Sequence, residues 1–306
     1  MAPAETAART LTIGSRGSQL ALWQARHVAA LLDGLGVATR VEIIKTTGDH
    51  LQTASLLQAG GKGLFTKEIE EALLQGAIDL AVHSLKDLPT EIPAGLALAA
   101  IPERDDPRDA IVGRRLQELP RGARVGTSSG RRAAQLQALR PDLNIESIRG
   151  NVDTRIRKLK EGQYDAILLA AAGLRRLGLE HEIAEILSPQ QMCPAPGQGA
   201  LAIETRARDS AFDLCARLHQ ESAGQAVACE RAVLAALGGG CQLPMGALAE
   251  VCGDTLEVIA VVFSRDGLQQ VRAEVTGPRN SPEQLGCAVA EDLIAKGART
   301  ILAESR

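Results

Sequence analysis

Short β-rich segments alternate with helical patterns along most of the chain, and this alternation constrains the fold more than any other feature of the sequence. Strand-like runs at Leu11–Ile13, Val41–Ile44 and Ile78–Val82 are separated by helical patterns that begin near Ser18 and Phe65. This order is typical of α/β proteins with parallel or mixed sheets. Because 306 residues exceed the usual size of one domain, the pattern predicts more than one.

Two breaks divide this alternation. The charged, Pro-containing stretch 101–108 predicts a crossover into a second domain, whose strands are expected near 124–126, 144–148 and 165–169. After the Pro- and Gly-rich segment 193–199, residues 200–204 have the pattern of a strand that returns to the first domain.

A helix from about 222 to 237 then begins a smaller α/β domain, with strands expected at 247–251, 256–263 and 271–276 and a final helix near 282–296. We therefore predict three domains, with the boundaries 1–102 plus 197–220, 103–196, and 221–306.

Composition argues against several classes of protein. No run approaches eighteen apolar residues, and residues 1–9 lack the pattern of a signal peptide, so we expect a cytoplasmic protein. A net charge of -3, with one Trp, one Tyr and three Phe, disfavours nucleic-acid binding. The six cysteines include no C-x-x-C pair, so we expect free thiols and neither a zinc site nor a disulfide framework.

Two loops have a similar pattern. Residues 14–18 and 126–132 each follow an expected strand, contain small hydroxylic residues and arginine, and open a helix. Such turns present backbone N–H groups and the positive end of the helix dipole, which suits phosphate or carboxylate ligands. The alternative is that Ser18 and Ser128 only cap their helices.

Positive charge is concentrated in the second segment. Arg131, Arg132, Arg149 and Arg155 are the better ligand candidates, since an arginine fork suits a carboxylate, and Arg149 is expected to end a strand. By contrast, Arg157, Lys158 and Lys160 fit a solvated helix face.

The sequence His83-Ser84-Leu85-Lys86-Asp87 follows an expected strand and places a hydroxyl, an ammonium and a carboxylate at its C-terminal end, where α/β proteins build sites. An ionised Asp87 in a cationic pocket would hold N–H groups and stabilise a developing cation. The alternatives are a surface ion pair of Lys86 with Asp87, and a structural role for His83.

Two further loops contain reactive groups. The segment 60–63 lacks the P-loop pattern, so it indicates a loop from which Lys62 reaches the cleft rather than a nucleotide cradle. Cys241 follows three glycines in a loop context, unlike the helical surroundings of Cys215, Cys229 and Cys287. An accessible thiol can be a nucleophile, although most cysteines are inert.

Taken in order, these strings resemble the porphobilinogen deaminase family from Ile13 to the C-terminal helix. Any one of them could occur by chance, but their ordered conjunction is specific. The strings are Arg16–Ala25, Gly60–Phe65, Ala81–Asp87, Val125–Arg132, Arg149–Asn151, Gly197–Gly199 and Gly240–Gln242.

The resemblance implies two domains like the halves of periplasmic binding proteins, with a cleft between them, and a small open-faced third domain. It also implies a dipyrromethane cofactor, built from the substrate and bound to Cys241 by a thioether. On this primer four porphobilinogen molecules are deaminated and joined, and hydroxymethylbilane is released by hydrolysis, as a step of porphyrin and heme biosynthesis. The family suggests a monomer that needs no metal.

Residue roles follow from the same resemblance. Asp87 matches the catalytic carboxylate, which contacts pyrrole N–H groups and stabilises the azafulvene-like cation formed as ammonia leaves. Lys62 matches a loop contact. The positions that bind the cofactor's side chains are Ser84, Lys86, Thr127, Ser129, Arg131 and Arg132, and those that contact substrate and growing chain are Arg16, Ser18, Arg149, Arg155 and Arg176.

Two positions depart from the family's pattern. Gly130 stands where leucine is frequent and puts the placement of Arg131 and Arg132 in doubt, since glycine has poor helix propensity. Gln58 stands where lysine is frequent and puts one loop contact in doubt. The alternative function is a non-catalytic anion-binding protein of the same fold, which would need neither Asp87 nor a modified Cys241.

Overall fold

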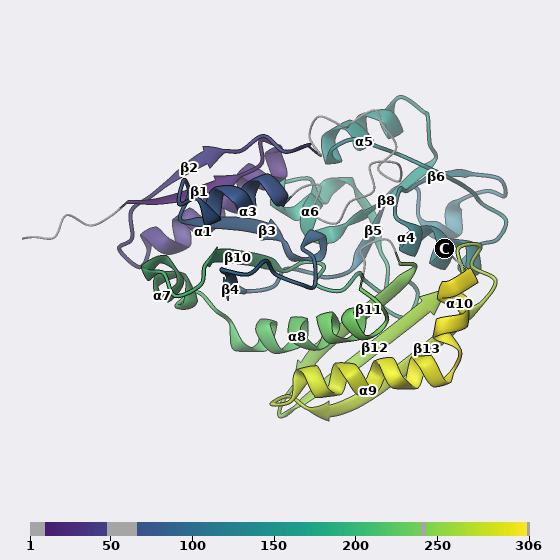
Figure 1. Ribbon diagram of the computed structural model, residues 1–306. Coiled ribbons are helices and arrows are strands. Elements are labelled where there is room, and N and C mark those ends of the chain that lie inside the picture. The colour runs from purple at the N-terminus through teal and green to yellow at the C-terminus, as the bar shows by residue number, and fades with distance from the viewer. Residues whose placement is uncertain (1–9, 48–65, 240–242, 305–306) are drawn as a thin grey trace, which may run out of the picture. The chain divides into compact units, whose positions relative to one another are not determined.

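The structure is a computed structural model that describes residues 10–47, 66–239 and 243–304. The chain divides into two compact units, and Figure 1 shows its helices and strands. The first contains Met1–His83, Glu91–Pro102 and Leu201–Gln220, and the second contains Ser84–Thr90, Glu103–Ala200 and Glu221–Arg306. Lys62, Gln58 and Cys241 lie outside the described residues.

A five-stranded sheet in the order β2-β1-β3-β10-β4 forms the first unit. Strand β1 pairs in parallel with β2 and β3, whereas β10 and β4 are antiparallel, so the sheet is mixed. Side chains of α1 such as Val28 and Leu32 pack with Ile13 and Ile203 in its core. The elements are β1 (Leu11–Ser15), α1 (Gln19–Asp33), β2 (Thr39–Ile43), α3 (Lys67–Leu74), β3 (Leu80–Ser84), β4 (Leu96–Ala100), β10 (Leu201–Arg206) and α7 (Ser210–Ala216).

A second five-stranded mixed sheet, in the order β7-β6-β8-β5-β9, lies in the second unit. Along β8, Leu168 and Ile167 belong to different apolar clusters because successive strand side chains point to opposite faces. Both faces are therefore covered. The elements are β5 (Asp109–Gly113), β6 (Arg124–Gly126), α4 (Gly130–Leu139), β7 (Asn144–Glu146), α5 (Val152–Lys160), β8 (Ala166–Ala170), α6 (Ala171–Arg176) and β9 (Ile183–Ile186), with 3₁₀ turns η1 (Leu85–Asp87), η2 (Leu116–Glu118) and η3 (Glu180–Glu182).

The C-terminal part of the second unit is an antiparallel three-stranded sheet covered by helices on one face (Figure 1). Helices α8 and α9 pack on it through a core that includes Val233, Val258 and Val289. The elements are α8 (Glu221–Ala236), β11 (Met245–Cys252), β12 (Thr255–Phe263), β13 (Gln270–Pro278), α9 (Pro282–Ala295) and α10 (Ala298–Glu304).

The expected α/β class is confirmed, and the expected strands and helices in the described ranges lie within a few residues of those observed. The sequence patterns did not predict β4, β5, β9 or α10. The strand that was expected to end at Arg149 ends instead at Glu146, so Arg149 lies in the following loop. No helix in the described ranges is long and apolar enough to cross a membrane.

Candidate active site

The segment that follows β3 presents its charged side chains from a single 3₁₀ turn, Leu85–Asp87. Leu85 is buried, and its backbone N–H donates to the carbonyl of Ala200 over 3.1 Å. Lys86 is half-buried, whereas Asp87 is exposed. The buried leucine therefore anchors the turn while the Asp87 carboxylate stays accessible.

Lys86 is not part of a solvated surface pair. Its Nζ donates to Oε1 of Gln198 over 3.4 Å, and no ion pair joins it to Asp87 among the described contacts. The pKa of Lys86 is lowered to about 8, by burial first and by the Arg132 charge second, while Asp87 and Asp109 oppose the shift. The surface-ion-pair alternative is therefore wrong.

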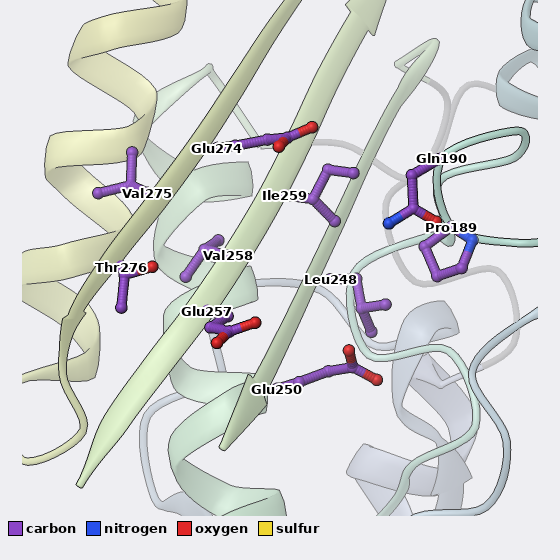
Figure 2. A pocket seen from close by; sticks show the side chains of 10 residues that line it. All are labelled: Pro189, Gln190, Leu248, Glu250, Glu257, Val258, Ile259, Glu274, Val275 and Thr276. Carbon is purple, nitrogen blue, oxygen red and sulfur yellow. The ribbon is translucent and has the colours of Figure 1, made fainter. Parts of the chain in front are cut away.

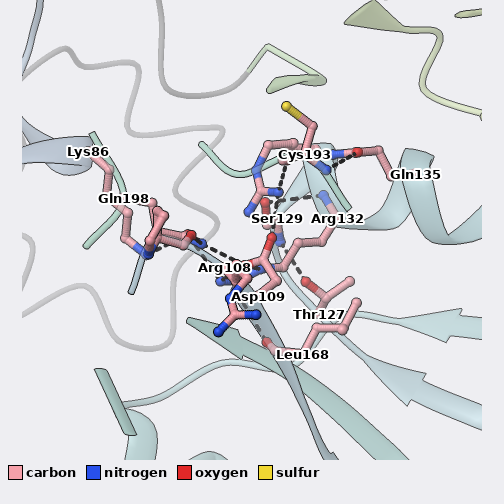
Figure 3. Close-up of polar contacts among 12 residues, drawn as sticks. Lys86, Arg108, Asp109, Thr127, Ser129, Arg132, Gln135, Leu168, Cys193 and Gln198 are labelled. Carbon is pink, nitrogen blue, oxygen red and sulfur yellow. Dashed lines mark hydrogen bonds and ion pairs between the residues drawn. The ribbon is translucent and has the colours of Figure 1, made fainter. Parts of the chain in front are cut away.

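Arg131 and Arg132 converge on one buried carboxylate, Asp109. Figure 3 shows Arg132 and Asp109 in this network. Nη1 of Arg131 donates to Asp109 Oδ2 over 2.6 Å and to the carbonyl of Cys193 over 2.6 Å. Nε of Arg132 donates to Asp109 Oδ1 over 2.9 Å, and its Nη1 donates to the carbonyl of Leu168 over 3.2 Å. Gly130 thus begins α4 without displacing either guanidinium from this network.

Asp109 is the acceptor at the centre of this network. Burial alone would raise the pKa of Asp109, but the Arg131 and Arg132 guanidiniums hold it well below its usual range. Gln198 adds a bond from Nε2 to Asp109 Oδ1 over 2.9 Å, and Oε1 of the same side chain accepts from Lys86 and Arg132. Gln198 therefore links the segment with Lys86 to the Asp109 cluster.

The start of α4 is capped differently from the sequence expectation. Ser129, not Ser128, is the N-cap, and its Oγ accepts from the backbone N–H of Arg132 over 3.4 Å. The Ser128 hydroxyl donates to the carbonyl of Ile148, and Thr127 Oγ1 accepts from the N–H of Ser129 over 3.2 Å. Ser18, by contrast, does cap α1, with its Oγ accepting from Ala21.

Arg155, like Arg132, interacts electrostatically with the Asp87 carboxylate. It is half-buried on the first turn of α5, and its Nε donates to the carbonyl of Gly150 over 2.7 Å. The pKa of Arg155 is lowered to about 10, by burial first and by the Arg132 charge second, while the Asp87 carboxylate opposes both effects. Lys86, Arg132 and Arg155 are therefore all electrostatically coupled to Asp87.

Other expected contacts have different surroundings. Arg176 is buried and donates to the carbonyl of Gly199 over 2.5 Å, with Asp105 as an ion-pair partner at 3.7 Å. Arg157 is exposed and pairs with Glu161 one turn on, as a solvated helix face predicts. Half-buried Arg149 accepts at its carbonyl from Lys158.

The site residues do not all lie in one unit. Arg16 and Ser18 belong to the first unit, where Arg16 follows β1 and is half-buried. The second unit holds Ser84, Lys86, Asp87, Thr127, Ser129, Arg131, Arg132, Arg149, Arg155 and Arg176.

Two residues of this hydrogen-bonded cluster, Asp109 and Gln198, were not predicted individually from the sequence. Asp109 is one of several acids after the crossover, and nothing local distinguishes it from Asp105 or Asp106. Gln198 lies in the Pro- and Gly-rich segment 193–199, and its position within the motif Gly197–Gly199 was the one sequence signal that could have identified it. His83 pairs with fully buried Glu204 over 2.9 Å within the first unit, which supports a structural role.

A cavity of about 220 Å³ lies elsewhere, on the sheet face of β11–β13 (Figure 2). Its lining includes Glu250, Glu257 and Glu274, and Glu250 stands directly opposite Glu257 on the neighbouring strand. Three carboxylates repel an anionic ligand, so this cavity does not suit a polycarboxylate. No group of His, Cys, Asp and Glu within the described ranges could hold a metal ion.

The Asp87 region has the opposite electrostatic character. One accessible carboxylate, that of Asp87, is electrostatically coupled to Lys86, Arg132 and Arg155. Arg131 shares the Asp109 carboxylate with Arg132. Guanidinium and ammonium groups bind carboxylates, and a carboxylate accepts N–H groups and stabilises a neighbouring cation. The arrangement suits a ligand with several carboxylates whose reaction develops positive charge.

Comparison with known proteins places both parts of the chain in one family. Residues 11–213 match the model "Porphobilinogen deaminase, dipyromethane cofactor binding domain", and residues 225–295 match "Porphobilinogen deaminase, C-terminal domain".

Individual relatives agree with the family models. The chain is 52% identical over 301 residues to the porphobilinogen deaminase of Roseiflexus sp. strain RS-1, covering 96% of this chain and 99% of that protein. It is 50% identical over 303 residues to that of Geobacter metallireducens, covering 97% and 95%. Among solved structures, it is similar to the methionine-binding protein MetQ with a TM-score of 0.44 and 13% identity, covering 68% of this chain and 89% of that one.

Proposed function

The chain belongs to the porphobilinogen deaminase family, and we propose that it joins porphobilinogen units with Asp87 as catalytic carboxylate and Cys241 as the attachment point of the cofactor. The family's activity places the protein in tetrapyrrole biosynthesis, as a transferase with a dipyrromethane cofactor. The finer proposal is a hydroxymethylbilane synthase, which adds four porphobilinogens and releases the linear product by hydrolysis.

The observation that carries this proposal is the accessible Asp87 carboxylate among Lys86, Arg132 and Arg155. Each pyrrole of the substrate carries acetate and propionate groups, so a growing chain accumulates negative charge. The cations bind that charge, and Asp87 accepts the pyrrole N–H and stabilises the cation formed as ammonia leaves the substrate. A simple anion receptor would have no use for a carboxylate in this position.

The residues present fit the cofactor. When bound, the dipyrromethane supplies the primer to which new pyrroles are added. Lys86 and Arg132 would hold its carboxylates, with Ser84, Thr127, Ser129 and Arg131 completing that set. We assign the substrate and chain contacts to Arg16, Ser18, Arg149, Arg155 and Arg176, and a loop contact to Lys62.

Besides the contacts assigned to them, buried Arg176 and Arg131 orient the site in this proposal. The guanidinium of Arg131 is shared between Asp109 and the Cys193 carbonyl, and that of Arg176 between Gly199 and Asp105. Through the carbonyls of Cys193 and Gly199 they fix the backbone on either side of Gln198, and they contribute positive potential.

We further propose three domains, 1–102 with 197–220, 103–196, and 221–306, the last with the attachment loop. We also propose a cytoplasmic monomer. Size-exclusion chromatography with light scattering tests the oligomeric state, because a dimer would double the 32.2 kDa mass of the chain.

Intact-protein mass spectrometry with peptide mapping tests the function directly. Purified protein should carry two linked pyrroles on Cys241, and added porphobilinogen should produce further pyrrole steps. Cys252 provides an internal control, since this thiol is exposed but belongs to no proposed site and should stay unmodified. An unmodified Cys241 that never gains mass would favour the anion-binding alternative.

A further inference from the structure

Arg231 on α8 contacts the segment that follows Asp87. Its Nη2 donates to the carbonyl of Pro89 over 2.7 Å and to that of Thr90 over 3.0 Å, and its Nη1 donates to the carbonyl of Leu88 over 3.4 Å. Three successive carbonyls therefore converge on one guanidinium. All four residues lie in the second unit.

This guanidinium has no carboxylate partner among the described ion pairs. It is half-buried, and burial lowers the pKa of Arg231. Other half-buried arginines of the second unit, such as Arg104 and Arg140, have carboxylate partners at 2.7 and 2.8 Å. Partial burial of a cation is costly. Within the described part of the chain, the three backbone carbonyls that accept from Arg231 offset that cost.

The end of the same helix meets the same segment. Gly239 lies three residues beyond α8, and a Cβ built on it would lie 3.1 Å from Thr90 Oγ1. Its φ of +48° is a left-handed conformation that glycine adopts without strain. The chain that leads toward Cys241 therefore runs close to the segment that begins at Asp87.

Helix α8 is itself held in place by the neighbouring residue, Glu230. This fully buried carboxylate accepts from Arg104 over 2.7 Å, from the backbone N–H of Gly197 over 2.6 Å and from that of Ala249 over 2.8 Å. A Cβ on Gly197 would collide with Leu85, so the segment that Glu230 holds also packs against the catalytic turn. Two adjacent residues of α8 thus support the 3₁₀ turn, Arg231 through the carbonyls of residues 88–90 and Glu230 through Gly197, which packs against Leu85.

We propose that Arg231 is a positioning residue that fixes the Asp87 turn relative to the helix leading to the cofactor loop. This inference rests on the proposed function, since it assigns Arg231 to the same reaction without contact to substrate. The 3₁₀ turn is short, and a single backbone bond, from the N–H of Leu88 to the carbonyl of Leu85 over 3.0 Å, closes it. The three bonds from Arg231 hold the exit of that turn, so their loss displaces Asp87 rather than unfolding the domain.

The test compares full-length Arg231→Met and Arg231→Lys with Arg279→Met. Arg279 is a matched control because it also contacts α8, with its Nε donating to Gln225 over 2.9 Å, but it does not touch residues 88–90. The readouts are kcat and KM for porphobilinogen, pyrrole content by intact mass, and hydrogen exchange of peptides covering 85–90.

For Arg231→Met we expect kcat to fall about 10- to 100-fold with KM changed less than about threefold, because small misplacement of a catalytic group reduces the chemical step. The amide of Leu88 should exchange faster. Arg231→Lys should be intermediate, since one ammonium cannot reproduce the fork of donors. Arg279→Met should stay within about twofold of the unmodified chain.

A kcat of Arg231→Met within twofold of the unmodified protein, at equal pyrrole content, overturns the proposal. Equal losses in Arg231→Met and Arg279→Met also overturn it, since they indicate general loosening of α8. If Arg231→Met does not fold, unaltered kcat and exchange in Arg231→Lys decide against it. If the unmodified chain neither carries pyrroles nor turns over, the proposed function fails, and the exchange comparison still tests the contact.

Discussion

Asp109 and Asp87 are two carboxylates of the second unit that differ in burial and in hydrogen bonding. Asp109 is fully buried and accepts from Arg131, Arg132 and Gln198. Asp87 is exposed, and no hydrogen bond among the described residues engages its side chain. The first carboxylate is consumed in holding guanidiniums, whereas the second remains available to a ligand.

The difference shows how a cationic site can contain an acidic side chain without forming an ion pair that occupies it. Arg132 is coupled to both carboxylates, but its short contacts are with Asp109, which fixes its direction. An Asp87 paired in the same way would have to break those bonds before it could stabilise a cation. Because Asp109 holds guanidiniums and Asp87 is proposed to act in the reaction, replacing the aspartate by asparagine should lower stability at position 109 and turnover at position 87.

Asp87→Asn should show the largest effect on turnover. Removing the charge while keeping the shape should lower kcat by about 10³-fold, since a positioned acid-base group contributes about 10² to 10⁴. Thermal unfolding should be unchanged because the side chain is exposed. Steady-state assays with porphobilinogen measure the first effect, and kcat within tenfold of the unmodified chain would remove Asp87 from its role.

Asp109→Asn should instead reduce stability. Two buried guanidiniums would lose their shared counter-charge, which costs about 3 kcal/mol in free energy of unfolding. Guanidinium chloride unfolding measures the change, with Asp292→Asn as a control because the pair of Asp292 with Lys296 is largely exposed. Equal unfolding midpoints for the two variants would refute the structural role of Asp109.

The pH dependence of that loss has a definite sign. Because the pKa of Asp109 is depressed in the folded protein, its contribution is fully present above the ordinary value of about 4 and is lost as pH falls toward the depressed one. The stability difference between the unmodified chain and Asp109→Asn should therefore narrow below about pH 4. A constant difference down to pH 2 would contradict this assignment.

Lys86→Arg should produce a smaller, pH-dependent effect. Lys86, whose pKa is lowered to about 8, loses its charge as pH rises through that value. The cofactor carboxylates that Lys86 would hold then repel the anionic substrate more strongly, so KM for porphobilinogen should increase by about fivefold between pH 7 and 9. An arginine stays charged and should flatten this rise. Profiles of KM for both proteins provide the measurement, and parallel profiles would exclude Lys86 as the titrating group.

The same deprotonation affects folding in the opposite direction. The unfolded chain binds the Lys86 proton more tightly, so the contribution of Lys86 to stability rises with pH between about 8 and 10.5. If KM rises with pH while the free energy of unfolding does not fall, the rise in KM results from the lost charge of Lys86 and not from unfolding.

Local patterns were sufficient to predict the α/β class and the position of Asp87 just after the C-terminal end of a strand, because a strand followed by polar residues is a short-range signal. They missed β5, and with it Asp109, since its importance comes from Arg131 and Arg132 more than twenty positions away. The alternative that Ser128 caps α4 was wrong because either hydroxyl satisfies the local pattern, and the contact of Ser128 with Ile148 leaves Ser129 as the cap. The sequence patterns could not predict contacts between side chains that lie far apart in the chain.

Arg157→Ala should have the smallest effect, and it sharpens the comparison on one helix. Arg157 and Arg155 lie two residues apart on α5, but the Arg157 side chain is 64% exposed and paired with Glu161, whereas Arg155 is half-buried and coupled to Asp87. Exposed pairs contribute less than about 1 kcal/mol, so Arg157→Ala should leave kcat, KM and stability nearly unchanged. Arg155→Ala should raise KM about tenfold through loss of one charge-assisted contact. Similar KM values for the two variants would mean that net charge on the helix, rather than the burial and direction of one arginine, governs binding.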